Sequence, residues 1–121
     1  MLKEDFAKAF LTTESFKWDP QKGFKLASGV MSPFYVDCRN LMAHPGPRRL
    51  MAELAFETIQ QLPFTVVGGL ELGAIALATS ISAHGYRTVP RREWRTFVVR
   101  KQVKEHGLGK LIEGAVQPGD R

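Results

Sequence analysis

The residues best suited to chemistry in this 121-residue sequence are cations that follow a short apolar run. Arg100 and Lys101 come directly after residues 96–99, Lys104 follows, and His106 precedes a glycine-rich segment. Arginine binds two phosphate oxygens at once, lysine supplies a mobile point charge, and histidine exchanges protons near neutral pH. A buried strand that ends in such a loop indicates a site for a phosphorylated ligand.

The positive charge of the chain is concentrated around this loop. The formal net charge is +5 at pH 7, whereas residues 87–110 alone hold eight Lys and Arg and two Glu, a net charge of +6. A local field of this sign favours a polyanion, either nucleic acid or a phosphorylated small molecule. The alternative is an ordinary solvated surface. Only Trp94 and Phe97 are aromatic in this segment, so it has no platform on which bases could stack. This composition argues against a nucleic-acid partner.

A second candidate anion site is the glycine-rich segment 68–73. It follows an expected strand at 64–67 and precedes an expected helix at 74–83, so it would lie where open α/β sheets bind ligands. The segment matches neither a Walker A motif nor a dinucleotide fingerprint. The alternative is that Gly68 and Gly69 serve only close packing of the strand and the helix.

The order of the expected helices and strands that position these residues predicts an α/β fold. The strand at 64–67, the helix at 74–83 with Gly85 at its end, and a strand at 96–100 have the spacing of a right-handed βαβ unit. The earlier chain predicts a helix at 5–11, a turn at 18–20, paired strands or a hairpin within 22–39, a break at 45–47 and a helix at 48–61.

Length and cysteine content indicate one cytoplasmic domain. No apolar run approaches the roughly 20 residues of a membrane span, and the N-terminus has no signal-peptide core. The only cysteine, Cys38, allows no internal disulfide, which suits a reducing compartment, and we expect it to be a partly buried apolar residue. His44 and His84 have no partners at metal-ligand spacing.

Two motifs taken together resemble the orotate phosphoribosyltransferase family. One is the cationic loop and the other lies within residues 23–39. The residues that carry the resemblance are Arg100, Lys101, Lys104, His106, Gly107 and Gly109 in the first motif, and Gly23, Phe24, Leu26, Ser28, Gly29, Ser32, Pro33, Tyr35, Asp37 and Arg39 in the second. The resemblance covers nearly the whole chain.

The resemblance implies a type I phosphoribosyltransferase fold, a parallel sheet flanked by helices. It further implies a single domain over 1–121, with an N-terminal helix and hood hairpin at 1–40 and the first part of the core at 41–121. The implied enzyme transfers phosphoribosyl from phosphoribosyl diphosphate to orotate in pyrimidine synthesis, giving orotidine 5′-monophosphate and pyrophosphate. It requires Mg²⁺ and is a homodimer that shares the cationic loop between subunits.

Site residues follow from the same resemblance. The resemblance implies that the diphosphate is bound by Arg100, Lys101, Lys104 and His106, and that Lys101 and Lys104 are the catalytic cations. The other substrate-binding positions are Phe34 and Tyr35 against the orotate ring, Lys25, and Glu71 and Leu72 in the glycine-rich segment.

The sequence departs from the family in three places. Ala27 stands where some members have lysine, which makes Lys25, on the same strand face, a possible substitute. Glu71 and Leu72 stand where some members have an aromatic residue and a lysine, so backbone N–H groups would make any diphosphate contact there. The family's acidic pair, Thr-Thr-Gly loop and base-recognising arginine would follow residue 121. We therefore expect an incomplete sheet and a truncated enzyme, with a non-catalytic phosphoribosyl diphosphate-binding or regulatory homologue as the first alternative and a nucleic-acid-binding protein as the second.

Overall fold

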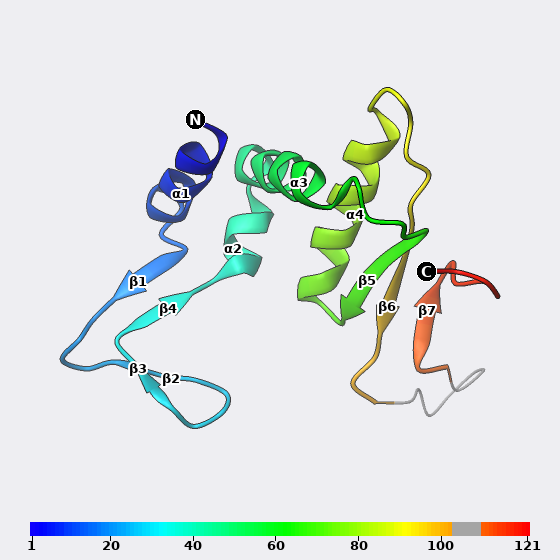
Figure 1. Cartoon of the computed structure of the whole chain (residues 1–121). Helices are drawn as coiled ribbons and strands as arrows, with labels where there is room; N and C mark the ends of the chain where they lie inside the picture. The colour runs from blue at the N-terminus through cyan, green and yellow to red at the C-terminus, as the bar shows by residue number, and fades with distance from the viewer. Residues whose placement is uncertain (103–109) are drawn as a thin grey trace. The chain divides into compact units, whose positions relative to one another are not determined.

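The computed structural model of the chain describes residues 1–102 and 110–121. It contains two compact units, Met1–Leu50 and Met51–Arg121. The first runs from blue to cyan in Figure 1 and the second from green to red. The expectation of a single domain with a boundary near residue 40 stays a prediction.

The first unit begins with helix α1 (Leu2–Thr12), which is joined to helix α2 (Cys38–Ala43) by a buried polar cluster. Ser15 is fully buried, and its hydroxyl accepts a hydrogen bond of 2.9 Å from Asn40 Nδ2. Asn40 Nδ2 also donates to the Thr13 carbonyl oxygen at 2.8 Å. Since buried polar groups are costly unless they are paired, these bonds fix α2 against the end of α1. The predicted first helix is confirmed and begins earlier than expected.

Two short antiparallel pairs of strands make up the rest of the first unit. Strand β1 (Phe16–Trp18) pairs with β4 (Phe34–Val36), and β2 (Phe24–Lys25) pairs with β3 (Met31–Ser32) as a hairpin. Gly29 closes the hairpin turn at φ +86°, a conformation that favours glycine. The predicted hairpin is confirmed, whereas β1 was not predicted.

The expectation for Cys38 is wrong, since this cysteine is exposed. It belongs to α2, because the Asp37 carboxylate accepts a hydrogen bond of 2.9 Å from the Asn40 N–H and so caps a helix there. The strand expected to continue to residue 39 therefore stops at Val36. The break expected at 45–47 lies one residue earlier, at His44, where α2 ends. Helix α3 (Pro45–Ile59) follows at once, so the helix predicted at 48–61 is confirmed with earlier bounds.

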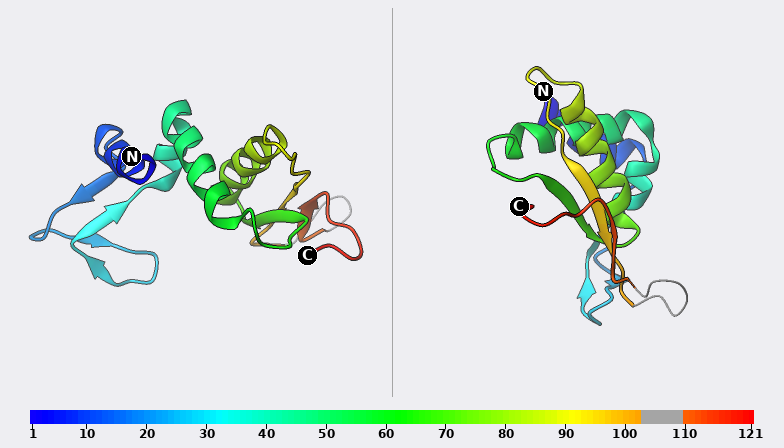
Figure 2. Two further views of the ribbon diagram at one scale, coloured as in Figure 1. Left: turned by 45° about the horizontal axis from the view of Figure 1, so that its top comes forward. Right: turned by 90° about the vertical axis from the view of Figure 1, so that its right-hand side faces the viewer.

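The second unit is an α/β arrangement built on a three-stranded sheet. Strand β5 (Val66–Leu70) is parallel to β6 (Arg95–Val99), and β7 (Ile112–Gly114) adds to β6 in the antiparallel sense. Helix α4 (Gly73–Tyr86) connects β5 to β6 and packs against both strands, on one side of the sheet (Figures 1 and 2). The predicted βαβ unit is confirmed, and the sheet becomes mixed through β7.

An aromatic cluster forms the core of the second unit. The Trp94 ring lies 4.4 Å from the Phe64 ring and 5.6 Å from the Phe56 ring, between ring centroids, and Phe56 also meets His84. Gly85 is buried inside α4, where a Cβ atom would come within 3.1 Å of the Trp94 ring. Gly85 therefore makes room for the indole ring. The expectation that Gly85 ends the helix is wrong, because α4 continues to Tyr86.

The end of the chain is tied to the start of the sheet through Asp120. Its carboxylate accepts hydrogen bonds from the Gln117 N–H at 2.6 Å and the Thr65 hydroxyl at 2.8 Å, and it pairs with Arg95. These donors, the Gln117 N–H first, hold the pKa of Asp120 below its ordinary value. The turn at Pro118 and Gly119 is thus anchored beside the start of β5.

Candidate functional site

Strands β5 and β6 end level with one another at one edge of the sheet. In their parallel register Leu70 is opposite Val99, and the Glu71 N–H donates a hydrogen bond of 3.0 Å to the Val99 carbonyl oxygen. The residue that follows β5 is therefore held beside Arg100, which follows β6. This is the carboxyl edge of the parallel strands, where open α/β sheets bind their ligands.

A strained turn joins β5 to α4 at this edge. The Gly73 N–H donates to the Glu71 carbonyl oxygen at 3.0 Å, which closes a three-residue γ-turn around Leu72. Leu72 has φ +57° and ψ −75°, a left-handed conformation that side chains rarely adopt. Such strain costs about 1–3 kcal/mol and is typical of ligand-binding sites. The Leu72 side chain is 67% exposed, so packing does not account for the strain.

The same turn places the N-terminus of α4 at the carboxyl edge. Leu72 is the N-cap residue and provides no side-chain hydrogen bond to the first turn. The N–H groups of Gly73 and Ile75 already donate to the carbonyl oxygens of Glu71 and Leu72. An anion at this terminus would interact with the helix dipole and with the remaining N–H groups of the first turn.

The segment predicted to be a glycine loop is shorter than expected. Gly68 and Gly69 lie inside β5, so the expected strand boundary at residue 67 is wrong. A Cβ atom on Gly68 would lie 2.1 Å from the Phe97 carbonyl oxygen and 2.8 Å from the Phe97 ring. Gly68 therefore serves close contact with strand β6. A Cβ atom on Gly69 would lie 3.2 Å from the Ala74 Cβ atom of α4, so the packing of strand against helix raised from the sequence applies to Gly69 alone. Only Glu71 and Leu72 separate β5 from α4.

Arg100 and Lys101 follow β6 at the same edge. The Arg100 N–H donates to the Leu111 carbonyl oxygen at 2.8 Å, which continues the pairing of β6 with the β7 side of the chain. Arg100 Nε lies 3.3 Å from Glu113 Oε1 in an ion pair, and the two side chains are 35% and 41% exposed. Lys101 is exposed. The structure thus brings Glu71, Leu72, Arg100 and Lys101 to one edge.

The other predicted site residues are placed as follows. Lys104 and His106 lie outside the described residues. Lys25 is exposed in β2, Phe34 is 47% exposed in β4, and Tyr35 is half-buried beside the Phe24 ring at 6.1 Å. These three belong to the first unit, and their roles toward orotate stay predictions.

Three arginines of the basic segment are engaged in contacts within the chain. Arg95 pairs with Asp120 at the start of β6, and Arg100 pairs with Glu113 beyond its end. The Arg91 guanidinium lies 4.1 Å over the Tyr86 ring. Intrachain contacts therefore engage these three arginines at separate places, which disfavours a nucleic-acid interface along the segment.

Residues 1–102 and 110–121 contain neither a metal-ligand cluster nor a membrane-spanning helix. No three His, Cys, Asp or Glu side chains come together there as a metal site would require. None of the helices in this part of the chain has the length and apolarity of a membrane span.

Known proteins match this arrangement over almost the whole chain. The orotate phosphoribosyltransferase of Pyrococcus abyssi is 34% identical over 99% of this chain and 62% of its own length. The chain is similar to orotate phosphoribosyltransferases over nearly its whole length. It spans less than two thirds of that relative's length. No family model matches the chain.

Solved structures of the family share the fold. The UMP synthase of Leishmania donovani superposes with a TM-score of 0.75 at 27% identity, covering 96% of this chain and 23% of that one. The orotate phosphoribosyltransferase of Mycobacterium tuberculosis, solved with phosphoribosyl diphosphate, has a TM-score of 0.60 at 32% identity over 92% of this chain and 56% of that one. The expected α/β phosphoribosyltransferase-like fold is thereby confirmed.

Sequence reasoning missed two features of the site. Glu113 had no signal of its own, because its pairing with Arg100 depends on β7 returning beside β6. The γ-turn at Leu72 was also missed, because leucine gives no sign of a left-handed conformation.

Proposed function

We propose that the protein transfers a phosphoribosyl group from phosphoribosyl diphosphate to orotate, giving orotidine 5′-monophosphate and pyrophosphate. The observation that carries this proposal is the carboxyl edge of β5 and β6. It combines a strained turn, a helix N-terminus and two cations in a chain similar to orotate phosphoribosyltransferases. An edge of this composition suits the diphosphate, the most highly charged part of the donor substrate.

The chemistry explains why cations are needed at this edge. As the bond between the ribose carbon and the diphosphate oxygen breaks, the electron pair of that bond leaves with the diphosphate. A ring nitrogen of orotate forms the new bond and gives up its proton to solvent. Negative charge therefore grows on the leaving group in the transition state. Arg100 and Lys101, together with the dipole of α4, would lower the barrier by stabilising that charge. Lys104 and His106 complete the cationic loop in this proposal.

Mg²⁺ forms part of the proposal through the substrate. Residues 1–102 and 110–121 contain no cluster of three His, Cys, Asp or Glu side chains. Mg²⁺ in proteins is bound largely by substrate phosphates and water, with only one or two carboxylates. We therefore place the ion on the diphosphate and assign it no ligand in this chain.

A homodimer and a cytoplasmic location complete the proposal. The family resemblance supports the dimer, in which the cationic loop serves the neighbouring subunit. The exposed single cysteine, Cys38, suits a reducing compartment. Light scattering of the purified chain measures the assembly directly.

Calorimetric titration of the chain tests the proposed function. Phosphoribosyl diphosphate with Mg²⁺ should bind saturably, and Lys101→Ala should weaken it about tenfold or more, because hydrogen bonds to charged groups contribute about 1.5–3 kcal/mol. Lys3→Ala, on the exposed side of α1, is the matched control and should leave the affinity unchanged. Binding of short DNA in preference to the diphosphate would contradict the proposal.

A chimera tests catalysis separately from binding. In the Pyrococcus abyssi relative, this chain would replace the 62% of the protein that it matches. Consumption of orotate by a folded chimera, lost on Lys101→Ala, is expected. A folded chimera that binds phosphoribosyl diphosphate but leaves orotate unconsumed would favour the non-catalytic alternative.

A further inference from the structure

We propose that Glu113 is a positioning residue for Arg100, so that binding of the diphosphate depends on a carboxylate of β7. This inference rests on the proposed function, because it concerns the same edge of the sheet. It begins from an unexpected contact: the arginine assigned to an anionic ligand already lies 3.3 Å from an anionic side chain.

The register of the sheet explains why these two residues meet. Glu113 is opposite Val98 in the antiparallel pair of β6 and β7. Side chains two residues apart on a strand point to the same face, so Arg100 is on the same side of the sheet as Val98 and diagonal to Glu113. Strand β7 therefore supplies the carboxylate at a fixed position beside the end of β6.

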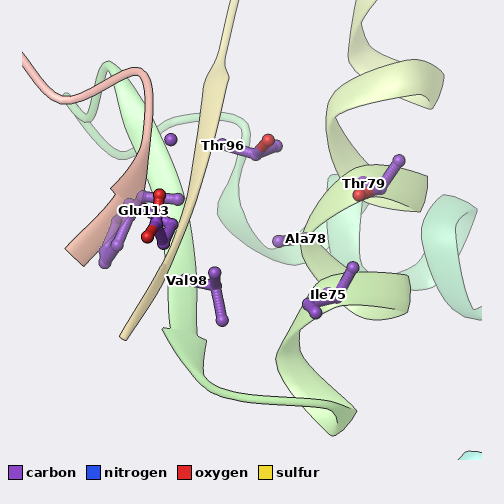
Figure 3. A pocket seen from close by; sticks show the side chains of 8 residues that line it. Ile75, Ala78, Thr79, Thr96, Val98 and Glu113 are labelled. Atoms are coloured by element: carbon purple, nitrogen blue, oxygen red, sulfur yellow. The ribbon is translucent and has the colours of Figure 1, made fainter. Parts of the chain in front are cut away.

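The surroundings of Glu113 hold its carboxylate near Arg100. Glu113 borders a cavity of about 210 Å³ between α4 and the sheet, which is lined on the helix side by Ile75, Ala78 and Thr79 and on the strand side by Thr96 and Val98 (Figure 3). Most of that lining is apolar. The Glu113 side chain is 41% exposed, and its carboxylate is more stable beside the Arg100 cation than over this apolar lining.

The ion pair also determines how the guanidinium is presented. Glu113 lies against Nε of Arg100, an atom that is buried and makes no well-aligned hydrogen bond. Phosphate oxygens are bound best by two parallel N–H groups of one guanidinium. A carboxylate on the Nε side attracts the guanidinium and restrains it without using its two terminal amino groups, which could then bind a phosphate. Glu113 thereby lowers the entropy that Arg100 would lose on binding a phosphate.

Electrostatics alone predicts the opposite effect of removing Glu113. A carboxylate near a diphosphate repels it, so Glu113→Gln should tighten binding if the residue is only a nearby negative charge. If Glu113 positions Arg100, the same substitution should weaken binding of inorganic pyrophosphate by up to about fivefold, the range of a partly exposed ion pair. The sign of the change separates the two accounts.

The experiment is calorimetric titration of the 121-residue chain with inorganic pyrophosphate. Glu113→Asp keeps the charge but withdraws the carboxylate by one methylene, so weaker binding is expected there as well, and it stands in if Glu113→Gln does not fold. Glu93→Gln removes an equal charge from an exposed residue before β6 and should not weaken binding. In an Arg100→Lys background, Glu113→Gln should lose its effect.

A spectroscopic readout distinguishes positioning from a general loss of structure. The Nε–H resonance of Arg100 should shift on Glu113→Gln while the backbone amide spectrum of β5 and α4 stays unchanged. If the wild-type chain binds pyrophosphate and Glu113→Gln binds it equally or more tightly, the role of Glu113 is refuted and the proposed function stands. If the wild-type chain does not bind pyrophosphate, the proposed function and this inference fall together.

Discussion

The Glu71 N–H donates a hydrogen bond of 3.0 Å to the Val99 carbonyl oxygen, which holds the turn after β5 level with the end of β6. This bond continues the parallel pairing of β5 and β6, which brings two distant segments of the sequence to the same edge. On one side it places the left-handed Leu72 and the start of α4, and on the other side Arg100 and Lys101. The predictions for the site depend on this alignment.

Glu71→Gln should tighten the binding of pyrophosphate. The Glu71 carboxylate belongs to the turn that we assign to the diphosphate, so its charge opposes the ligand. Removing one partly screened charge near a surface changes affinity by about twofold to fivefold. Titration calorimetry at low ionic strength measures the change, and Glu57→Gln on the exposed side of α3 is the control. Weaker binding would show that the Glu71 side chain itself contacts the ligand.

Leu72→Gly should give a more stable protein than Leu72→Ala. Both variants remove the exposed leucine side chain, but only glycine adopts φ +57° without steric strain. After allowance for the greater flexibility of glycine in the unfolded chain, the difference in unfolding free energy should be about 1 kcal/mol. Urea unfolding of the two variants measures it. Equal stabilities would mean that the turn relaxes at no cost.

The sequence predicted the parts of the fold that rest on local pattern. The apolar run at 96–99, the small residues of 74–83 and the glycines between the two strands indicated the βαβ unit, and β6 and α4 lie close to their expected bounds. The register of β5 was less predictable. Gly68 and Gly69 resemble a loop in sequence, yet they belong to a strand because Phe97 occupies the space beside Gly68.

Features that depend on long-range pairing could not be predicted. Residues Phe16–Trp18 are followed directly by Asp19-Pro20, so their sequence does not indicate a strand. They form β1 because they pair with β4. Cys38 is in a helix because Asp37 caps it, a competing local signal that was overlooked. For the site, Arg100 and Lys101 were predicted at the end of a strand, whereas the contact with Glu113 requires the register of β7. The roles of Lys104 and His106 stay predictions.

Gly68→Ala should strongly destabilise the second unit. Its Cβ atom would lie 2.1 Å from the Phe97 carbonyl oxygen, so backbone of β5 or β6 must move, at a cost of about 3 kcal/mol or more in unfolding free energy. Gly73→Ala is the matched control, because a Cβ atom there meets nothing within 4 Å. The control should be neutral or stabilising by up to about 1 kcal/mol in α4. Thermal unfolding of both variants distinguishes packing from a general intolerance of alanine.

Acid should weaken the anchor formed by Asp120. Since the pKa of Asp120 is lower in the folded chain, ionised Asp120 stabilises the fold fully above the ordinary carboxyl value of about 3.9. The contribution is lost as the pH falls below that value through the folded pKa. The difference in unfolding free energy between the wild type and Asp120→Asn should therefore shrink over this acidic window. A difference that stays constant with pH would rule out a role for the charge.

The assignment of the diphosphate to the carboxyl edge is tested most directly by nuclear magnetic resonance of the chain titrated with pyrophosphate. We predict saturable shifts in the backbone amide signals of Glu71, Leu72 and Gly73 and of Arg100 and Lys101, with one common dissociation constant. Signals of Thr65 and Asp120, at the opposite end of the sheet, should not move. Saturable shifts confined to other residues, or no saturable shift at this edge, would contradict the assignment.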